Sequence, residues 1–119
     1  MTRKEALQEL LVKVKAGECP SRPQVFSAFP ERDMFDGDPV GRLFDWACDP
    51  EDLRAMGAAL SLLEAVLPGY NYDIIKRGKR FTVHVYESTD CVGWNGVSDT
   101  PSRALLIAIL NALVAMEDG

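Results

Sequence analysis

The segment from residue 104 to residue 116 is apolar around most of its helical circumference, and no other feature constrains the fold as strongly. Thr100 and Pro101 before it form a typical helix start, a side-chain cap followed by proline. One helical face would carry Leu105, Ala108, Ile109, Ala112, Leu113 and Met116. Much of the remaining circumference would be covered by Leu106, Ile107, Leu110 and Val114. Because such a helix must be buried on most sides, it either lies between a sheet and another layer or contacts a partner chain.

Two amphipathic helices are indicated earlier in the chain. Thr2 and Glu5 have the spacing of a capping box, and apolar residues then fall on one helical face, which predicts a helix over residues 3–16. Asp49, followed by proline and two acidic residues, is a strong start for a second helix over residues 50–67. The apolar stripe of this second helix would consist of Leu53, Met56, Leu60, Leu63 and Leu67.

The residues between the second and the last helix predict a small antiparallel sheet. Residues 70–76 and 80–87 are β-branched and aromatic runs on either side of Gly78, which is typical of a hairpin. Residues 91–97 would add a third strand, which two glycines weaken. Alternation along the hairpin would place Phe81, Val83 and Val85 on one face and Thr82, His84 and Tyr86 on the other.

These elements predict a single α+β domain over residues 1–119, a sheet of about three strands packed with three helices. A chain of 119 residues has enough apolar material for one compact core. A three-layer α/β/α sandwich and a two-layer arrangement need the same elements in the same order, and they differ in where the first helix packs. The sequence is compatible with both arrangements.

Residues 18–48 form a long segment that is predicted to be irregular, acidic and aromatic, with a short helical turn around residues 40–46. Its prolines disfavour helix, but its apolar residues are too many for a disordered linker. Residues 31–52 hold eight carboxylates against two arginines, a net charge of −6. The segment is a candidate partner-binding surface, because aromatic residues are enriched in interfaces; its residues are Asp33, Asp36, Asp38, Phe44, Asp45 and Trp46. Alternatively, the carboxylates form a solvated loop and the aromatic side chains belong to the core.

The chain carries no recognisable catalytic or metal-binding constellation. His84 is the only histidine, and Cys19, Cys48 and Cys91 lack zinc-site spacing and are interpreted as reduced thiols. The sequence contains no glycine-rich phosphate loop, and nothing marks Ser88 or Cys91 as an activated nucleophile. We therefore expect no enzymatic activity, no metal and no cofactor.

Charge and hydropathy argue against membrane and general nucleic-acid binding. No apolar run reaches the roughly 20 residues that span a bilayer, and the N-terminus lacks a secretory pattern, so a cytoplasmic protein is expected. The net charge of −5 argues against general binding to phosphate backbones. Residues 76–80 form a basic hairpin tip, but four charges are a small footprint, and such charges also discourage edge pairing of strands.

The chain resembles the phage ABA sandwich domain family, small proteins encoded by phages and prophages. The likeness is carried by Leu67-Pro68-Gly69-Tyr70-Asn71-Tyr72 before the hairpin and by Thr100-Pro101-Ser102-Arg103-Ala104-Leu105 at the start of the last helix. Thr2-Arg3-Lys4-Glu5-Ala6-Leu7 is similar to the family's usual opening helix. The resemblance covers about two thirds of the chain and implies a layered α/β/α arrangement, a phage or prophage origin and a bacterial host. It implies no catalytic residues, and the acidic segment departs from the family pattern.

Three functions are considered. The first is a non-enzymatic phage or prophage accessory protein that binds another protein with a basic surface. One form of it is an anti-CRISPR-like inhibitor of a host defence complex, whose basic nucleic-acid channel the acidic segment would occupy. The second is a self-associating structural or regulatory domain, a homodimer through Leu106, Ile107, Leu110 and Val114. The third, nucleic-acid binding through residues 76–80, is disfavoured by the acidic net charge.

Overall fold

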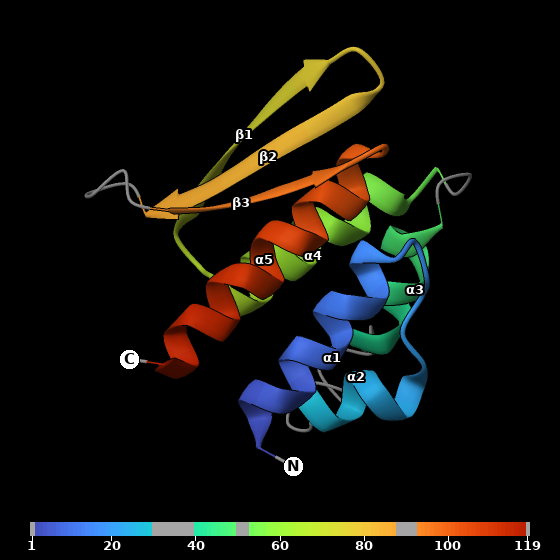
Figure 1. Cartoon of the computed structure of the whole chain (residues 1–119), viewed down its shortest axis with the longest axis vertical. Helices are drawn as coiled ribbons and strands as arrows, with labels where there is room; N and C mark the ends of the chain where they lie inside the picture. Colours follow the sequence, from blue (N-terminus) through green and yellow to red (C-terminus); the bar gives the residue numbers. More distant parts are fainter. Residues whose placement is uncertain (1, 30–39, 50–52, 88–92, 119) are drawn as a thin grey trace.

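The computed structural model describes residues 2–29, 40–49, 53–87 and 93–118, which form five helices and a three-stranded sheet. Along the chain these are α1 (Arg3–Lys15), α2 (Arg22–Ala28), α3 (Val40–Cys48), α4 (Ala55–Val66), β1 (Tyr70–Arg77), β2 (Arg80–Glu87), β3 (Gly93–Ser98) and α5 (Pro101–Asp118) (Figure 1). The predicted α+β class is confirmed. Within the described ranges, no helix combines the length and the apolar character that crossing a membrane requires.

The first helix, α1, begins at the capping box that the sequence predicts. The Thr2 hydroxyl accepts a hydrogen bond from the Glu5 backbone N–H, and the Glu5 carboxylate accepts one from the Thr2 backbone. The hydrogen bonds that this carboxylate accepts from Thr2 lower the pKa of Glu5. The buried face of α1 packs on α5 and α2 and consists of Ala6, Leu7, Leu10 and Val14.

The segment predicted to be irregular contains two helices, which corrects that prediction. At the start of α2, the Ser21 hydroxyl accepts a hydrogen bond from the Gln24 backbone N–H in a second capping box. Pro23 lies in the first turn of α2, where its missing N–H removes no helical hydrogen bond. The predicted turn around residues 40–46 is part of α3. Both helices contribute buried residues to the core.

The fourth helix, α4, begins later than predicted and buries a broader face than the predicted stripe, of which Leu63 and Leu67 are buried and Met56 and Leu60 pack against the core. Its N-cap residue, Arg54, makes no side-chain cap, and the predicted start at Pro50 lies outside the described residues. Leu53, predicted to belong to the apolar stripe, is fully exposed. The buried residues of α4 are Ala55, Ala58, Ala59, Leu62 and Leu63. Small residues dominate this face because α4 packs closely against both α3 and α5.

The three strands form an antiparallel meander in sequence order. The β1–β2 hairpin turns at Gly78, whose φ of 62° lies in the left-handed region that favours glycine. The predicted alternation of faces is confirmed, because Val83 and Val85 of β2 are buried whereas His84 between them is more exposed. The sheet therefore has one core-facing side and one opposite side, which we call the outer face.

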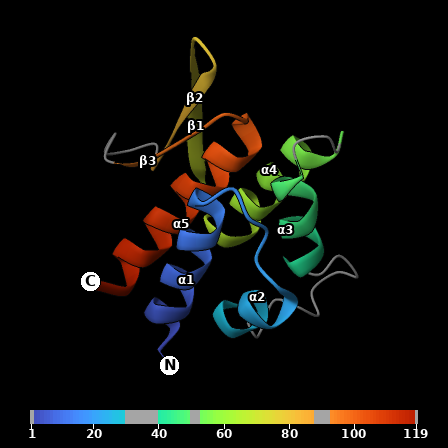
Figure 2. The same ribbon diagram turned by 45° about the vertical axis from the view of Figure 1, so that its right-hand side comes forward.

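The last helix, α5, lies between the sheet and the rest of the helices. It packs on β2 and β3 on one side and on α1, α4 and α3 on others, and every residue from Ser102 to Leu110 is buried. Figures 1 and 2 show the helices on one side of the sheet. α4 lies beside α5, and α1, α2 and α3 lie farther from the sheet than α5 does. Among the described residues the α/β/α sandwich is therefore not formed, because no helix covers the outer face.

The helix face predicted to form a homodimer lies inside the molecule. Leu106, Ile107 and Leu110 are buried, and Val114 is partly buried against the same core. The prediction of a dimer contact at these residues is wrong, because the chain's own sheet and helices already cover most of the apolar circumference of α5.

A close approach between β3 and α5 occurs at Gly96. A Cβ atom built on Gly96 would overlap the carbonyl oxygen of Ala104 and lie 2.5 Å from the backbone nitrogen of Ala108. One turn farther along α5, Asn111 Nδ2 donates a 2.8 Å hydrogen bond to the Asn95 carbonyl oxygen. The glycine that weakens β3 as a strand thus allows the backbones of β3 and α5 to meet.

Candidate functional site

The acidic and aromatic residues predicted to bind a partner do not form one exposed surface in the described part of the chain. Asp33, Asp36 and Asp38 lie outside the described residues. Phe44 is 1% exposed, and its ring packs against that of Phe29 with centroids 5.9 Å apart. For Phe44 the prediction of a surface anchor is wrong, because its side chain joins α2 and α3 in the core.

Asp45 and Trp46 of α3 are half-buried and engaged within the chain. The Arg54 guanidinium lies 4.0 Å from the centroid of the Trp46 ring and covers one face of the indole. The Cys19 thiol donates to Asp45 Oδ1 at 3.7 Å. These contacts limit what the two side chains can offer to a partner.

The largest group of exposed apolar side chains among the described residues lies on the β1–β2 hairpin. β1 is an edge strand that packs substantially only on β2, and every residue from Asn71 to Arg77 is exposed. The exposed fractions of Tyr72, Ile74 and Ile75 are 40%, 40% and 49%. Because side chains alternate along a strand, Tyr72 and Ile74 lie on the helix side and Ile75 on the outer face. The free end of the hairpin extends past α5 (Figure 2).

The outer face of the sheet combines apolar and polar residues. Ile75 and Val97 are exposed there in one row of the register, on either side of β2. In the next row His84 Nδ1 is hydrogen-bonded to Asn95 Oδ1, and the His84 ring stacks on Tyr86 with centroids 5.4 Å apart. The histidine thus has a defined orientation within the surface of the sheet.

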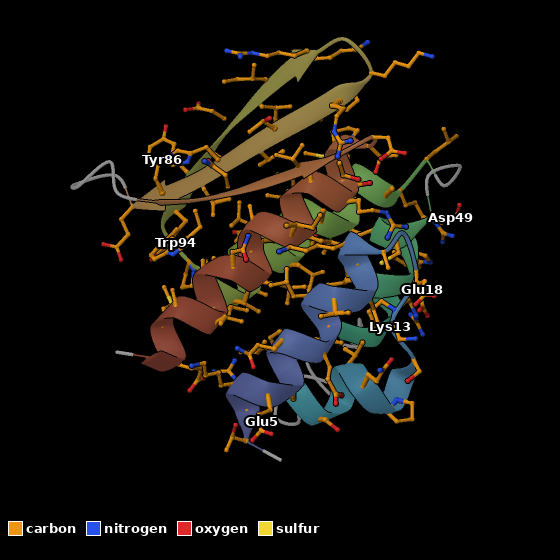
Figure 3. The ribbon with its side chains drawn as sticks, in the orientation of Figure 1. Glu5, Lys13, Glu18, Asp49, Tyr86 and Trp94 are labelled. Atoms are coloured by element: carbon orange, nitrogen blue, oxygen red, sulfur yellow. The ribbon has the colours of Figure 1, made fainter. Side chains whose placement is uncertain are left out.

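A hollow of about 300 Å³ opens where β1 leaves α4. At its rim the Tyr70 hydroxyl donates a 3.0 Å hydrogen bond to Glu87, and the Tyr70 ring stacks on Trp94 with centroids 6.4 Å apart. Figure 3 shows Trp94 on the helix side of the sheet and Tyr86 on the outer face. Burial and the bond to Glu87 raise the pKa of Tyr70 to about 12, so its hydroxyl stays a donor up to strongly alkaline pH. The hollow is lined by Leu60, Leu63, Glu64, Leu67, Gly69, Tyr70 and Tyr72.

The free end of the hairpin is basic. Lys76, Arg77, Lys79 and Arg80 are all exposed, and the nearest carboxylate on β1 is that of Asp73. The hairpin therefore has an apolar base, at the hollow, and a positively charged tip.

The chain has no match that would identify it. No protein-family model, no curated protein and no solved structure matches the sequence or the fold. The resemblance to the phage ABA sandwich family therefore stays a prediction. Across the described ranges, no three histidine, cysteine, aspartate or glutamate side chains are grouped so that they could hold a metal ion.

Arg103, in the first turn of α5, is a buried cation that the sequence analysis did not single out. Its Nη1 donates to the carbonyl oxygens of Val14 and Glu18, at 3.1 Å each, and its Nη2 donates to that of Cys48 at 2.6 Å. Val14 and Cys48 are in the last turns of α1 and α3, where carbonyl groups carry the negative end of the helix dipole. One guanidinium thus joins the ends of two helices to the start of a third.

Cys19 and Cys48 lie beside this arginine, which donates to the carbonyl oxygens of Glu18 and Cys48, and the Cys19 thiol lies against the last turn of α3. Cys48 is buried at the end of α3, whereas Cys19 is exposed, with its Sγ 4.0 Å from the Phe44 carbonyl oxygen. The hydrogen bond from Cys48 lowers the pKa of Cys19, and donating that bond, together with burial, raises the pKa of Cys48. We call Cys19, Asp45, Cys48 and Arg103 the thiol corner.

Sequence reasoning missed both the hairpin surface and the thiol corner. For the hairpin a signal was present, because the neighbours Ile74 and Ile75 must point to opposite sides of a strand and one of them must face away from the core. For Arg103 the signal was a single cation in an otherwise apolar helix, which requires buried acceptors. The approach of Cys19 to Cys48 had no signal in the spacing of the cysteines.

Proposed function

We propose that this protein acts without catalysis, by binding another protein along the edge strand β1. The exposure of β1 supports this function: among the described residues it is an edge strand whose residues 71–77 are all exposed, yet it carries Tyr72, Ile74 and Ile75. An edge strand presents unpaired backbone groups to other chains, so proteins normally cover or blunt it. Here the charges are concentrated at the tip, and residues 70–75 include one charged side chain.

The binding mode would be addition of a partner strand to the sheet. In this mode main-chain hydrogen bonds supply affinity, and alternate side chains enter pockets on either side of the sheet. On the helix side, Tyr72 lines the hollow beside α4, which would receive a partner side chain, and Ile74 is exposed one row closer to the tip. On the outer face, Ile75 would contact the partner directly.

The partner that fits this edge is an extended protein segment with apolar residues at one end and acidic residues at the other. The apolar residues would meet the base of the hairpin, and the acidic residues would meet Lys76, Arg77, Lys79 and Arg80 at its tip. Such a contact should weaken as salt concentration rises, because exposed charges are screened.

The variant Ile75→Lys tests this proposal, with Val12→Lys as the matched control. Val12 is an apolar residue of α1 that is more exposed than Ile75, at 66% against 49%, and remote from the hairpin. Each tagged protein would be used to capture proteins from a bacterial lysate, and affinity for the captured protein would then be measured. We expect Ile75→Lys to weaken binding about 30-fold or more, as for a central interface residue, and Val12→Lys to leave it unchanged. Equal binding by both variants, or no specific capture by the unaltered chain, would contradict the proposal.

The acidic inhibitor is the second candidate, supported by the net charge of −6 over residues 31–52. In this case the partner would be a basic, nucleic-acid-handling complex, and the chain would belong to a phage or prophage, as the family resemblance implies. The variant with Asp33, Asp36, Asp38 and Asp45 all replaced by asparagine distinguishes the two candidates. It should lose binding if the acidic segment is the contact and retain binding if β1 is the contact.

A further inference from the structure

The thiol corner brings together two cysteines of unequal exposure. Cys19 belongs to the connection between α1 and α2, and Cys48 is the last residue of α3. Cys19 is exposed, and its Sγ lies 3.7 Å from Asp45 Oδ1 and 4.0 Å from the Phe44 carbonyl oxygen, at the last turn of α3, where Cys48 is buried. The arrangement thus places an accessible sulfur beside the helix end that holds a buried one.

We propose that Cys19 and Cys48 are an oxidation site, at which hydrogen peroxide converts the two thiols into an intramolecular disulfide. Cys19 is the attacking sulfur because it is the exposed member of the pair, and Cys48 is the resolving sulfur. Reactive cysteines of this type are accessible, favour the thiolate and lie next to a second thiol.

Hydrogen peroxide is the only oxidant and the only co-reactant that the reaction needs. In the first step the Cys19 sulfur attacks one peroxide oxygen; an S–O bond forms, the O–O bond breaks, and the leaving oxygen takes up the thiol proton as water. In the second step the Cys48 sulfur attacks the Cys19 sulfur; the S–S bond forms, and the hydroxyl group leaves with the Cys48 proton as a second water. Two electrons pass from the thiol pair to the peroxide.

The surroundings of the pair favour the first step. The Cys48 hydrogen bond stabilises a thiolate on Cys19, and the nearby Arg103 guanidinium acts in the same direction, while Asp45 opposes it. Closure to an S–S bond of about 2.05 Å needs a small shift of the backbone. That shift can occur at Gly17, which lies two residues before Cys19, outside any helix or strand. In a reducing cytoplasm both thiols would rest in the reduced form.

Mass spectrometry of the full-length Cys91→Ser chain tests the proposal. After hydrogen peroxide at neutral pH and alkylation of the remaining thiols, tryptic peptides 16–32 and 43–54 should be recovered as one disulfide-linked pair. The oxidised chain should remain monomeric, melt at a higher temperature than the reduced chain, and return to the reduced form with dithiothreitol. In the Cys48→Ser, Cys91→Ser chain, Cys19 should instead accumulate as a sulfenic acid that dimedone traps.

The matched variant Cys19→Ser, Cys91→Ser isolates the buried thiol, and Cys48 in it should react several-fold more slowly than Cys19. Three results would overturn the proposal. These are oxidation of Cys19 without the linked peptides, linked peptides found solely between two chains, and linkage that forms equally fast in urea-unfolded protein. The last result would show that the folded arrangement does not bring the thiols together.

Discussion

Replacing Gly96 by alanine is expected to destabilise the protein by about 3 kcal/mol or more. The added methyl group would overlap the Ala104 carbonyl oxygen and crowd the Ala108 backbone nitrogen of α5. These are backbone atoms, so no change of rotamer can relieve the overlap, and α5 would have to move away from β3. A shift of this size should lower the melting temperature by roughly 10 °C in circular dichroism.

The matched control for this prediction is Gly57→Ala. Gly57 is exposed on α4, and a Cβ atom there would have no other atom within 4 Å. Alanine in a helix interior is more favourable than glycine by about 0.5–1 kcal/mol, so this variant should be slightly more stable than the natural chain. If Gly96→Ala were as stable as Gly57→Ala, the packing of α5 on β3 described above would be wrong.

Replacing Arg103 by methionine is expected to destabilise the protein by about 3 kcal/mol. Methionine retains most of the buried apolar stem but cannot donate to the carbonyl oxygens of Glu18 and Cys48, which lose a charged partner. The ends of α1 and α3 would then no longer be joined to α5. Urea unfolding of this variant and of Arg103→Lys would measure the loss, and lysine should recover a part of it because it keeps the charge without the planar fork.

Arg80→Met is the control for the arginine substitution, because Arg80 is exposed at the hairpin tip. The free energy of unfolding of Arg80→Met should stay within about 0.5 kcal/mol of that of the natural chain. If Arg103→Met and Arg80→Met lowered the free energy of unfolding equally, Arg103 would contribute no more to stability than an exposed arginine does.

The elements with complete local signals were predictable from the sequence. The capping box of Thr2 and Glu5, the left-handed turn at Gly78 and the cap-and-proline start at Thr100 each depend on residues within four positions of one another. For α2 the local signal was equally complete, in Ser21 and Gln24, but the prolines of the segment were interpreted as helix breakers. Pro23 is compatible with helix because it lies in the first turn.

Which face of a helix or strand is buried depends on the element that packs against it, and local sequence signals do not show that element. The predicted stripe of α4 is confirmed at Leu63 and Leu67, but the packing of α4 against both α3 and α5 buries its alanines as well, and Leu53 stays exposed. Likewise, periodicity shows that α5 is buried on most sides without showing what covers it. The approach of Cys19 to Cys48 follows from where α3 and Arg103 lie, so it was not accessible to sequence analysis, whereas the adjacent Ile74 and Ile75 did indicate an apolar side chain on the outer face of β1.

Site-specific photo-cross-linking tests the central claim, binding of a partner protein along β1, most directly. A benzophenone amino acid would replace Tyr72 on β1, Asp49 at the end of α3, or Val12 on α1, each in an otherwise natural chain. We predict that position 72 alone cross-links to a partner in the host lysate, and that the linked partner peptide is an extended segment with acidic residues. Cross-links from position 49 in place of position 72 would contradict the account and favour the acidic inhibitor.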